Sequence, residues 1–408
     1  MLVKRNIENQ IINVAETFPA LILTGSRQVG KSTLLKYLAD EKKIKINSYV
    51  TLDDYNDLKL AIDDPEEFFL KYKTPLVIDE IQKAPQLFQM IKKIIDKEPK
   101  NGLFFLTGSE SFGLMKNVSE TLAGRVAILE LLPFSTTEIN QYKNGIFLPT
   151  TFKNYNDKSM TQDDICNIIY KGLFPKITIE KNIDIDLYYE SYIKTYIERD
   201  LRQFINIKNL MKFRNFLSTV AVRSGCELII DELAKDNDID NKTVLLWLSA
   251  LEASNLIFLI QPFYSSEFKK LTKRKKIYFC DCGLARYLIG INSLQSLKNS
   301  FLIGQLWETY VVIEIIKSFV NNGKQYKNSL YWFRNNSKEE IDLIIEYDNI
   351  IYPIEIKKTT TPNYTVAKTF SILERIKNKK IGLGSVICNV QDINQLNATT
   401  VALPIKSL

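Results

Sequence analysis

Histidine is absent from all 408 residues of this sequence. Histidine is the side chain best suited to act as a general base near neutral pH, and it is a frequent ligand of zinc. Its absence excludes Ser-His-Asp triads, H-E-x-x-H zinc sites and nucleases that depend on histidine. Any catalysis by this chain must therefore use carboxylates, lysine, hydroxyl groups and a bound metal ion.

Cysteine is scarce and scattered. The chain has five cysteines, an odd number without any C-x-x-C pair: Cys166, Cys226, Cys280, Cys282 and Cys388. This usage indicates a reducing compartment and no disulfide framework. Cys280 and Cys282 alternate within a predicted strand, and no second pair of ligands accompanies them to complete a metal site.

Long apolar stretches are also missing. No run of 18 apolar residues occurs, and the first ten residues, MLVKRNIENQ, are too polar for a signal peptide. We therefore expect a soluble cytoplasmic protein with no membrane partner. The composition is 45% hydrophobic and 25% charged, which is ordinary for globular proteins, and the length predicts two to four domains. The net charge of +7 mildly favours a polyanionic partner.

The stretch LILTGSRQVGKSTLL contains the spacing G-x-x-x-x-G-K-S from Gly25 to Ser32. An apolar strand precedes it and a helix follows, which is the context of a phosphate-binding P-loop. Lys31 is expected to reach the β- and γ-phosphates of ATP, and Ser32 to bind Mg²⁺. The alternative is an ordinary turn before a helix. The predicted nucleotide-binding residues of the loop are Gly25, Ser26, Arg27, Gln28, Val29, Gly30, Lys31, Ser32 and Thr33.

A second part of a nucleotide site is predicted where the apolar strand at residues 75–78 ends in Asp79 and Glu80. An acidic residue at the carboxyl end of a buried strand can hold the Mg²⁺ shell, which is the role expected of Asp79. Glu80 is placed to polarise a water molecule for attack on the γ-phosphate. The alternative is that the two carboxylates cap the helix predicted at residues 84–95.

Two later strands add further candidates. Thr107 and Ser109, at the end of the strand predicted at residues 103–107, are candidates to contact the γ-phosphate from the side opposite the P-loop. Arg125 precedes a fifth strand and can stabilise the transition state in cis, or across the interface of a homo-oligomer. It can equally be a surface arginine. Alternating strands and helices predict a mostly parallel sheet covered on both faces.

The C-terminal region carries the pattern D…E-x-K. Asp342 and Glu355 lie on neighbouring predicted strands, and Glu308 lies on the apolar helix predicted at residues 301–319. These three carboxylates can bind one divalent metal ion, and Lys357, two residues beyond Glu355 on the same strand face, can position water. This is the constellation of a restriction-endonuclease-like core. The alternatives are a chance occurrence and a domain of this fold without catalysis.

The middle region predicts a winged helix. Helices at residues 210–224, 230–236 and 244–255 precede strands at 256–260 and 276–280. Basic residues are dense between the strands: Lys269, Lys270, Lys273, Arg274, Lys275 and Lys276. Such a wing can bind DNA phosphates. The alternatives are a solvated hairpin and a wing that packs against the ATPase domain.

Several of these segments together resemble a large prokaryotic family of AAA-type ATP-binding proteins that carry a C-terminal domain of unknown function. The resemblance rests on LILTGSRQVGKSTLL, YVTLDD, PLVIDEIQKAP, FFLTGSES and SETLAGRVAILELLPFS. It continues through YIKTYIERDL, ALEASNLI and IYFCDCGLARYL to IDLIIE and IEIKK, so it covers nearly the whole chain. The resemblance implies ATP binding in the N-terminal part.

The predicted architecture is α/β, with an AAA-type P-loop ATPase and its lid or connector at residues 1–185, a winged helix at 186–290 and a restriction-endonuclease-like domain at 291–408. One functional hypothesis is an ATP-hydrolysing protein that acts on DNA and carries a Mg²⁺-dependent nuclease. Another is a nucleotide-dependent switch whose C-terminal domain binds DNA or protein without cleavage. A small-molecule kinase is disfavoured because Glu80 favours water as the acceptor.

Overall fold

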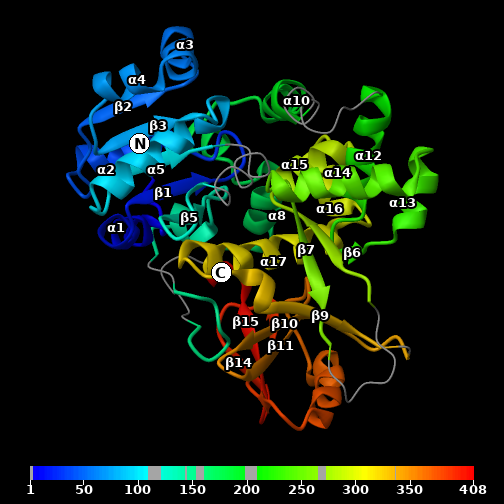
Figure 1. Cartoon of the computed structure of the whole chain (residues 1–408). Coiled ribbons are helices and arrows are strands. Elements are labelled where there is room, and N and C mark those ends of the chain that lie inside the picture. The colour runs from blue at the N-terminus through cyan, green and yellow to red at the C-terminus, as the bar shows by residue number, and fades with distance from the viewer. Residues whose placement is uncertain are drawn as a thin grey trace. The chain divides into compact units, whose positions relative to one another are not determined.

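The computed structural model describes residues 3–108, 121–142, 145–152, 160–197, 209–264, 273–335 and 337–408. Its contacts divide the chain into two compact units (Figure 1). The first comprises Met1–Phe134 with two short later segments, Ala253–Asn255 and Val320–Gly323. The second comprises most of the remaining chain, so residues 135–185, which were expected to form a lid or connector of the ATPase, have their contacts in the second unit.

The first unit is built on a five-stranded sheet in the order β2-β3-β4-β1-β5. Its strands are β1 (Ala20–Thr24), β2 (Ser48–Thr51), β3 (Leu76–Asp79), β4 (Phe104–Thr107) and β5 (Val126–Glu130). Every neighbouring pair is parallel, which confirms the predicted parallel sheet. All residues of β1, β3 and β4 are buried, as expected for apolar strands covered on both faces.

Short helices precede and connect these strands. They are α1 (Glu8–Thr17), α2 (Lys31–Asp40), α3 (Tyr55–Asp63), α4 (Pro65–Lys71), η1 (Ile81–Lys83) and α5 (Leu87–Lys97). Phe88, Ile91 and Ile95 of α5 are buried at helical spacing, and they join Phe68 of α4 and Ile22 of β1 in one core cluster. This core fixes α4 and α5 against the sheet whose carboxyl edge carries the predicted nucleotide residues.

The second unit begins with a helical region. Its helices are α7 (Thr136–Ile139), α8 (Gln162–Lys171), α9 (Pro175–Ile179), α10 (Ile185–Tyr192), η2 (Ile193–Ile197), α12 (Leu210–Val222), α13 (Ile230–Asn237), α14 (Asn241–Ala253), α15 (Cys282–Ile289) and α16 (Leu294–Asn299). Three strands lie among them: β6 (Cys226–Glu227), β7 (Ile257–Pro262) and β8 (Lys276–Phe279). Strand β8 pairs antiparallel with both β6 and β7, and α13 and α14 fall between β6 and β7 in the chain.

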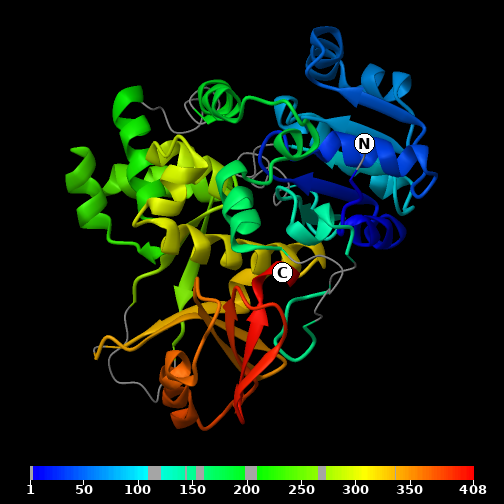
Figure 2. The ribbon, with the colours of Figure 1, turned by 180° about the vertical axis from the view of Figure 1, so that it is seen from behind.

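The C-terminal region continues the same sheet. Its elements are α17 (Ile303–Asn321), η3 (Tyr326–Asn328), β9 (Leu330–Arg334), β10 (Glu340–Tyr347), β11 (Ile350–Ile356), η4 (Tyr364–Arg375), β12 (Lys380–Ile381), β13 (Gly384–Cys388), β14 (Asn394–Asn397), β15 (Thr400–Pro404) and η5 (Ile405–Ser407). Strands β9, β10 and β11 form an antiparallel meander, and β13 runs parallel to β11. Because β7 pairs with β9, one sheet runs from β14 to β6 through both regions (Figure 1 and Figure 2).

Helix α17 is buried along most of its length. Its sequence is apolar on nearly every side, which is typical of a helix surrounded by protein. Besides Glu308, which the sequence marks as a candidate metal ligand, the helix contains Glu314 and Lys317, which are buried and form an ion pair at 2.8 Å. Within the part of the chain that the structure describes, no helix has both the length and the apolar character needed to cross a membrane.

Candidate functional site

The loop between β1 and α2 has the backbone that an anion-binding turn requires. Gly25 has φ +140°, and a Cβ atom there would lie 2.1 Å from the carbonyl oxygen of Leu131, so only glycine fits. Gly30, with φ +94°, precedes the first residue of α2. The predicted order of strand, glycine-rich loop and helix is therefore present, with the helix N-terminus next to the loop.

Lys31 is buried at the start of α2. Its Nζ atom donates hydrogen bonds to the carbonyl oxygens of Gly25 and Ser26, both at 2.9 Å. Burial lowers the pKa of Lys31 to about 8, although Glu80 and Asp79 partly oppose the shift. The ammonium group thus lies inside the loop, bound to carbonyls that phosphate oxygens can replace.

Asp79 ends β3 and gathers hydroxyl groups from three other elements. Ser32 Oγ donates to Asp79 Oδ1 at 2.8 Å, and Tyr49 OH donates to Oδ2 at 3.1 Å. Thr107 Oγ1, at the end of β4, also donates to Oδ1. A hydroxyl and a carboxylate in contact are hard oxygen donors, the ligand type that Mg²⁺ prefers. The residues present therefore fit a magnesium ion shared by Ser32 and Asp79.

Glu80 follows Asp79 with a left-handed backbone, φ 58° and ψ 43°. This conformation costs a non-glycine residue about 1–3 kcal/mol and is common at functional sites. Its backbone N–H donates to Thr107 Oγ1 at 3.3 Å, and the Gln82 amide donates to its carboxylate. Helix α5 begins only at Leu87, and no side chain caps it, so the structure does not show the alternative helix-capping role for the two carboxylates.

The structure does not bring Arg125 to the P-loop of its own chain. Arg125 Nε contacts Asp96 Oδ1 at 2.6 Å, and the residue directly precedes β5. Because Val126 pairs with Ala20 at the start of β1, Arg125 lies at the edge where the parallel strands begin, opposite the P-loop. Ser109 lies outside the described residues. The other candidate, Thr107, is the last residue of β4, and its contacts are described above.

Two residues that the motifs did not identify support the site. Arg5 is buried and donates to the carbonyl oxygens of Val29, in the P-loop, at 3.0 Å and of Leu132 at 2.6 Å. Its guanidinium lies 4.6 Å from the ring centre of Phe134. Tyr49 on β2 binds Asp79 as described above. No spacing rule marks either residue, because both reach the site from other parts of the chain.

Three residues of the predicted C-terminal site, Asp342, Glu355 and Lys357, lie close together. Lys357 Nζ lies 2.6 Å from Glu355 Oε1 and 3.7 Å from Asp342 Oδ2. The backbone N–H of Ile356 donates to Asp342 Oδ2 at 2.8 Å. Burial, followed by the nearby Asp342 carboxylate, raises the pKa of Glu355 to about 7.

Glu308 does not join them in a metal centre. Its Oε1 atom accepts from Tyr278 OH at 2.8 Å and lies 3.0 Å from Lys276 Nζ. Burial raises the pKa of Glu308, and Lys276 opposes that shift. Across the described ranges, no three Asp, Glu or Cys side chains form a group that could hold a metal ion, so the predicted ion shared by Glu308, Asp342 and Glu355 is not assembled.

Lys276 also corrects the prediction of the basic wing. It is a buried residue of β8, ion-paired with Glu308 and Glu340, and so is not part of an exposed basic surface. Lys273 and Arg274 are exposed. Lys269 and Lys270 lie outside the described residues. Side chains alternate between the two faces of a strand, and the density of basic residues in the sequence does not reveal which of them point into the core.

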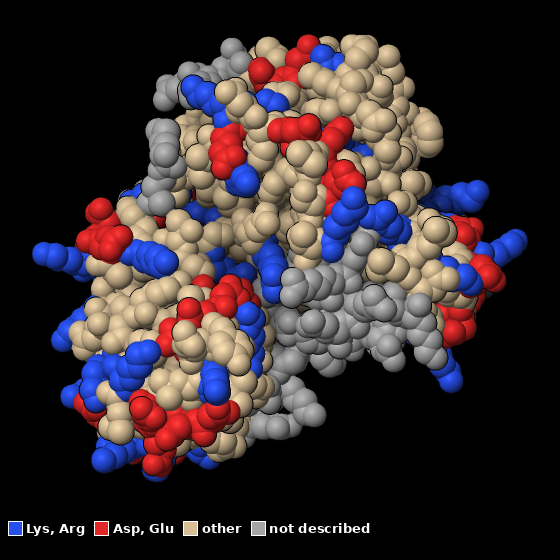
Figure 3. Space-filling model, turned by 90° about the horizontal axis from the view of Figure 1, so that it is seen from above, with Lys and Arg blue, Asp and Glu red and all other residues tan. Residues whose placement is uncertain are grey.

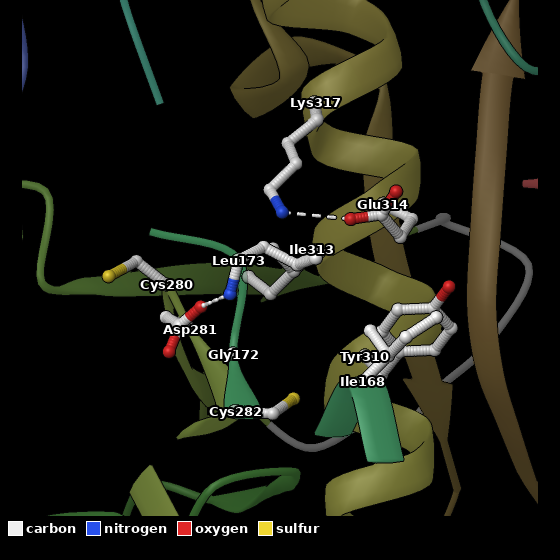
Figure 4. A pocket seen from close by; sticks show the side chains of 10 residues that line it. All are labelled: Ile168, Gly172, Leu173, Cys280, Asp281, Cys282, Tyr310, Ile313, Glu314 and Lys317. Atoms are coloured by element: carbon white, nitrogen blue, oxygen red, sulfur yellow. Dashed lines mark hydrogen bonds and ion pairs between the residues drawn. The ribbon is translucent and has the colours of Figure 1, made fainter. Parts of the chain in front are cut away.

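A small pocket beside α17 contains both cysteines of the C-D-C sequence (Figure 4). Its volume of about 10 Å³ suits roughly one water molecule. Asp281 accepts a backbone N–H at 2.6 Å, and Lys317 points toward Glu314. Burial raises the pKa of Cys280 and of Cys282, so both thiols stay protonated. These contacts indicate a structural junction.

Comparisons with known proteins agree with the nucleotide site. Residues 17–140 match the family model of an AAA domain, and residues 162–295 and 303–408 match two domains of unknown function, DUF8612 and DUF4143. An uncharacterized protein of Mycobacterium tuberculosis is 27% identical over 364 residues, which is 89% of this chain and 76% of the relative. An uncharacterized protein of Methanocaldococcus jannaschii is 26% identical over 343 residues, 80% of this chain and 72% of that protein.

A solved structure is also similar in part. The Walker-type ATPase PABY2304 of Pyrococcus abyssi aligns with a TM-score of 0.45 and 16% identity, over 70% of this chain and 96% of that chain. The AAA match covers β1, the P-loop, β3 and β4, which together carry the described nucleotide-site residues. The N-terminal part of the chain is therefore an AAA-type domain with a P-loop.

Proposed function

We propose that this chain binds ATP with Mg²⁺ and hydrolyses it in its first unit. The observation that carries the proposal is the contact of Ser32, Thr107 and Asp79 beside a glycine-rich loop that opens a helix. This juxtaposition places a metal-binding carboxylate next to a phosphate-binding turn, as nucleotide hydrolysis requires. The AAA domain match over residues 17–140 supports it.

Each residue then has a defined task. Lys31 exchanges the carbonyls of Gly25 and Ser26 for phosphate oxygens, and the loop N–H groups bind the same phosphates. Ser32 and Asp79 would hold a magnesium ion, which would supply charge neutralisation at the phosphates. Glu80 accepts a proton from the attacking water, while its backbone N–H bond to Thr107 holds it in place.

The test is phosphate release by the purified full-length chain with ATP and Mg²⁺. We expect turnover in the parent and none in Asp79→Asn, which keeps the hydrogen-bonding shape but removes the charge that holds the ion. Equal turnover in the parent and Asp79→Asn would overturn the assignment. We propose that Arg125 takes part in catalysis only across the interface of a homo-oligomer, where a neighbouring copy supplies it. Mixing Arg125→Ala chains with Glu80→Gln chains tests this role.

We propose further that the second unit contains a winged helix and a restriction-endonuclease-like domain. The order α12, β6, α13, α14, β7, β8, with β8 between β6 and β7, supports the first. Helix α17, the β9-β10-β11 meander, η4 and the parallel strand β13 support the second. Asp342 on β10, Glu355 on β11 and Lys357, the residue after β11, lie next to one another, which also supports that fold.

The function we favour for the second unit is a nucleotide-dependent switch that binds its target without cleaving it. DNA is one proposed target, through Lys273, Arg274 and Lys275. Two observations indicate that any DNA-binding surface is small. Leu245 and Leu246 of α14 are 53% and 48% exposed, and these apolar side chains cannot bind phosphates. Basic and acidic side chains are interspersed over the face shown in Figure 3. Incubation of the full chain with DNA, ATP and Mg²⁺ tests this; Asp342-dependent cleavage would restore the nuclease hypothesis.

A further inference from the structure

A cluster of four carboxylates and two ammonium groups joins β8, α17 and the β10–β11 pair in the second unit. Its members form two ion-paired groups, Lys276 with Glu308 and Glu340, and Lys357 with Asp342 and Glu355. Asp342 links the groups because its carboxylate interacts electrostatically with both Lys276 and Glu308. Five of them come from the region that we assign to the restriction-endonuclease-like fold. The sixth, Lys276, is supplied by the strand that follows the proposed wing.

Lys276 is the most enclosed charge of the cluster. Its side chain is only 3% exposed, and Nζ lies 3.0 Å from Glu308 Oε1 and 2.7 Å from Glu340 Oε1. The same ammonium lies 5.2 Å from the ring centre of Trp332. A cation that has lost its hydration is stable only where opposite charges replace the water, so these two carboxylates are its counter-ions.

Strand β8 provides a second contact to the same carboxylate. Tyr278 lies two residues after Lys276 and so shares its strand face, and its hydroxyl donates to Glu308 Oε1 at 2.8 Å. The Oε1 atom of Glu308 therefore already contacts two groups from β8, the Tyr278 hydroxyl and the Lys276 ammonium. Strand pairing of β8 with β7 and β6 fixes both groups in place.

The other side of the cluster is incompletely satisfied. Lys357 binds Glu355 Oε1, and Asp342 receives the backbone N–H of Ile356. Glu355 is 7% exposed, and its second oxygen, Oε2, has no hydrogen-bond partner among the residues that the structure describes. A buried carboxylate oxygen without a partner is unusual, so the cluster has one acceptor oxygen left for a donor group or a cation.

We propose that Lys276 is a built-in counter-ion that takes the place of a divalent cation and keeps metal ions out of the C-terminal carboxylate cluster. A tethered ammonium and a divalent ion repel each other within one cluster, so the site accepts a metal only when Lys276 is removed. Asp342 and Glu355 would then be its main ligands. The inference rests on the proposed nuclease-like fold of this region, and it explains how that fold is kept from catalysis.

The experiment is Mn²⁺ binding by the nucleotide-free full-length chain, followed by calorimetry and by thermal unfolding. The parent should show no Mn²⁺ binding that depends on Asp342. Lys276→Met should gain Mn²⁺ binding that depends on Asp342, with an affinity at least about tenfold above the detection limit set by the parent, since one neighbouring charge changes the affinity of a carboxylate for a cation by that factor or more. The gain should disappear in Lys276→Met combined with Asp342→Asn.

Lys317→Met is the matched control, because Lys317 is an equally buried lysine ion-paired with Glu314 on the same helix as Glu308. It should lose stability without gaining a metal site. Asp342-dependent Mn²⁺ binding in the parent would overturn the proposal, even if Lys276→Met failed to fold. A folded Lys276→Met chain without a new site would also overturn it. Failure of the parent to hydrolyse ATP would count against the proposed function alone.

Discussion

Lys31 holds two carbonyl groups of its own loop, and we propose that a bound nucleotide replaces them with phosphate oxygens. Lys31→Ala should weaken ATP binding by roughly 10- to 100-fold, since a hydrogen bond to a charged group contributes about 1.5–3 kcal/mol. Glu80→Gln should keep ATP affinity and lower turnover by about 10²- to 10⁴-fold, because it removes only the base. Titration with a fluorescent ATP analogue and phosphate release separate the two effects. Equal loss of binding in both variants would contradict the role of Glu80.

The pKa of Lys31 leads to a pH prediction. The pKa falls from 10.5 to about 8 on folding, so between these values the unfolded chain binds a proton that the folded chain lacks. Stability of the nucleotide-free chain should therefore rise with pH in this window. ATP affinity should fall, by up to about tenfold per pH unit above pH 8, because phosphates require the charged ammonium. Lys31→Arg should keep its affinity over the same range, and a parent affinity independent of pH would refute this assignment.

Arg5 illustrates what the motifs could not reveal at the residue level. The P-loop positions follow from backbone rules that a spacing records, whereas Arg5 reaches Val29 and Leu132 across the fold. Because Arg5 holds the loop and touches no reacting atom, Arg5→Met should raise the KM for ATP about tenfold while kcat changes less than about twofold. Arg5→Lys, which keeps a donor, should recover part of the affinity. A fall in kcat at constant KM would instead indicate a loss of folded protein.

Strand β8 shows, for a secondary-structure element, the same limit of what sequence motifs can reveal. Its length and partner were predictable, since an apolar strand after a basic stretch suggests the second arm of a hairpin. Its orientation was not, and the basic run therefore appeared to continue through Lys276, although that residue faces the carboxylates. The spacing of Lys276 and Tyr278 by two residues was the available signal for a shared face.

The predicted basic wing still includes the basic residues Lys273, Arg274 and Lys275. Replacing Lys273, Arg274 and Lys275 by Ala should weaken DNA binding for all sequences and reduce the slope of log affinity against log salt by about 2–3, one counterion per lost phosphate contact. Fluorescence anisotropy of labelled duplexes across a salt series measures that slope. Leu245→Ser with Leu246→Ser on α14 is the comparison, since no phosphate contact is removed. An unchanged slope in the triple variant would assign the wing to another role.

At the scale of the whole molecule, the parallel sheet of the first unit was predictable because alternating apolar strands and helices allow few arrangements. The strand pairing of the second unit was harder to predict from the sequence. The pairing of Gln261 with Tyr331 connects β7 to β9 across residue 290, where the sequence predicts a domain boundary between α15 and α16. Pairing between strands 70 residues apart in the chain leaves no local pattern, whereas hairpins such as β10–β11 do.

The shared sheet predicts how fragments of this protein behave. Residues 291–408 alone would lose the partner of β9, the core side chain of Phe263 and the buried Lys276 that neutralises Glu308. An unpaired strand edge and an unpaired buried carboxylate both favour unfolding or aggregation, the latter by about 3–5 kcal/mol. Residues 135–408 keep all three contacts and should unfold in urea with one sharp transition. The shorter fragment should unfold gradually and bind a hydrophobic dye; a sharp transition at the same urea concentration would show that the C-terminal region is an independent domain after all.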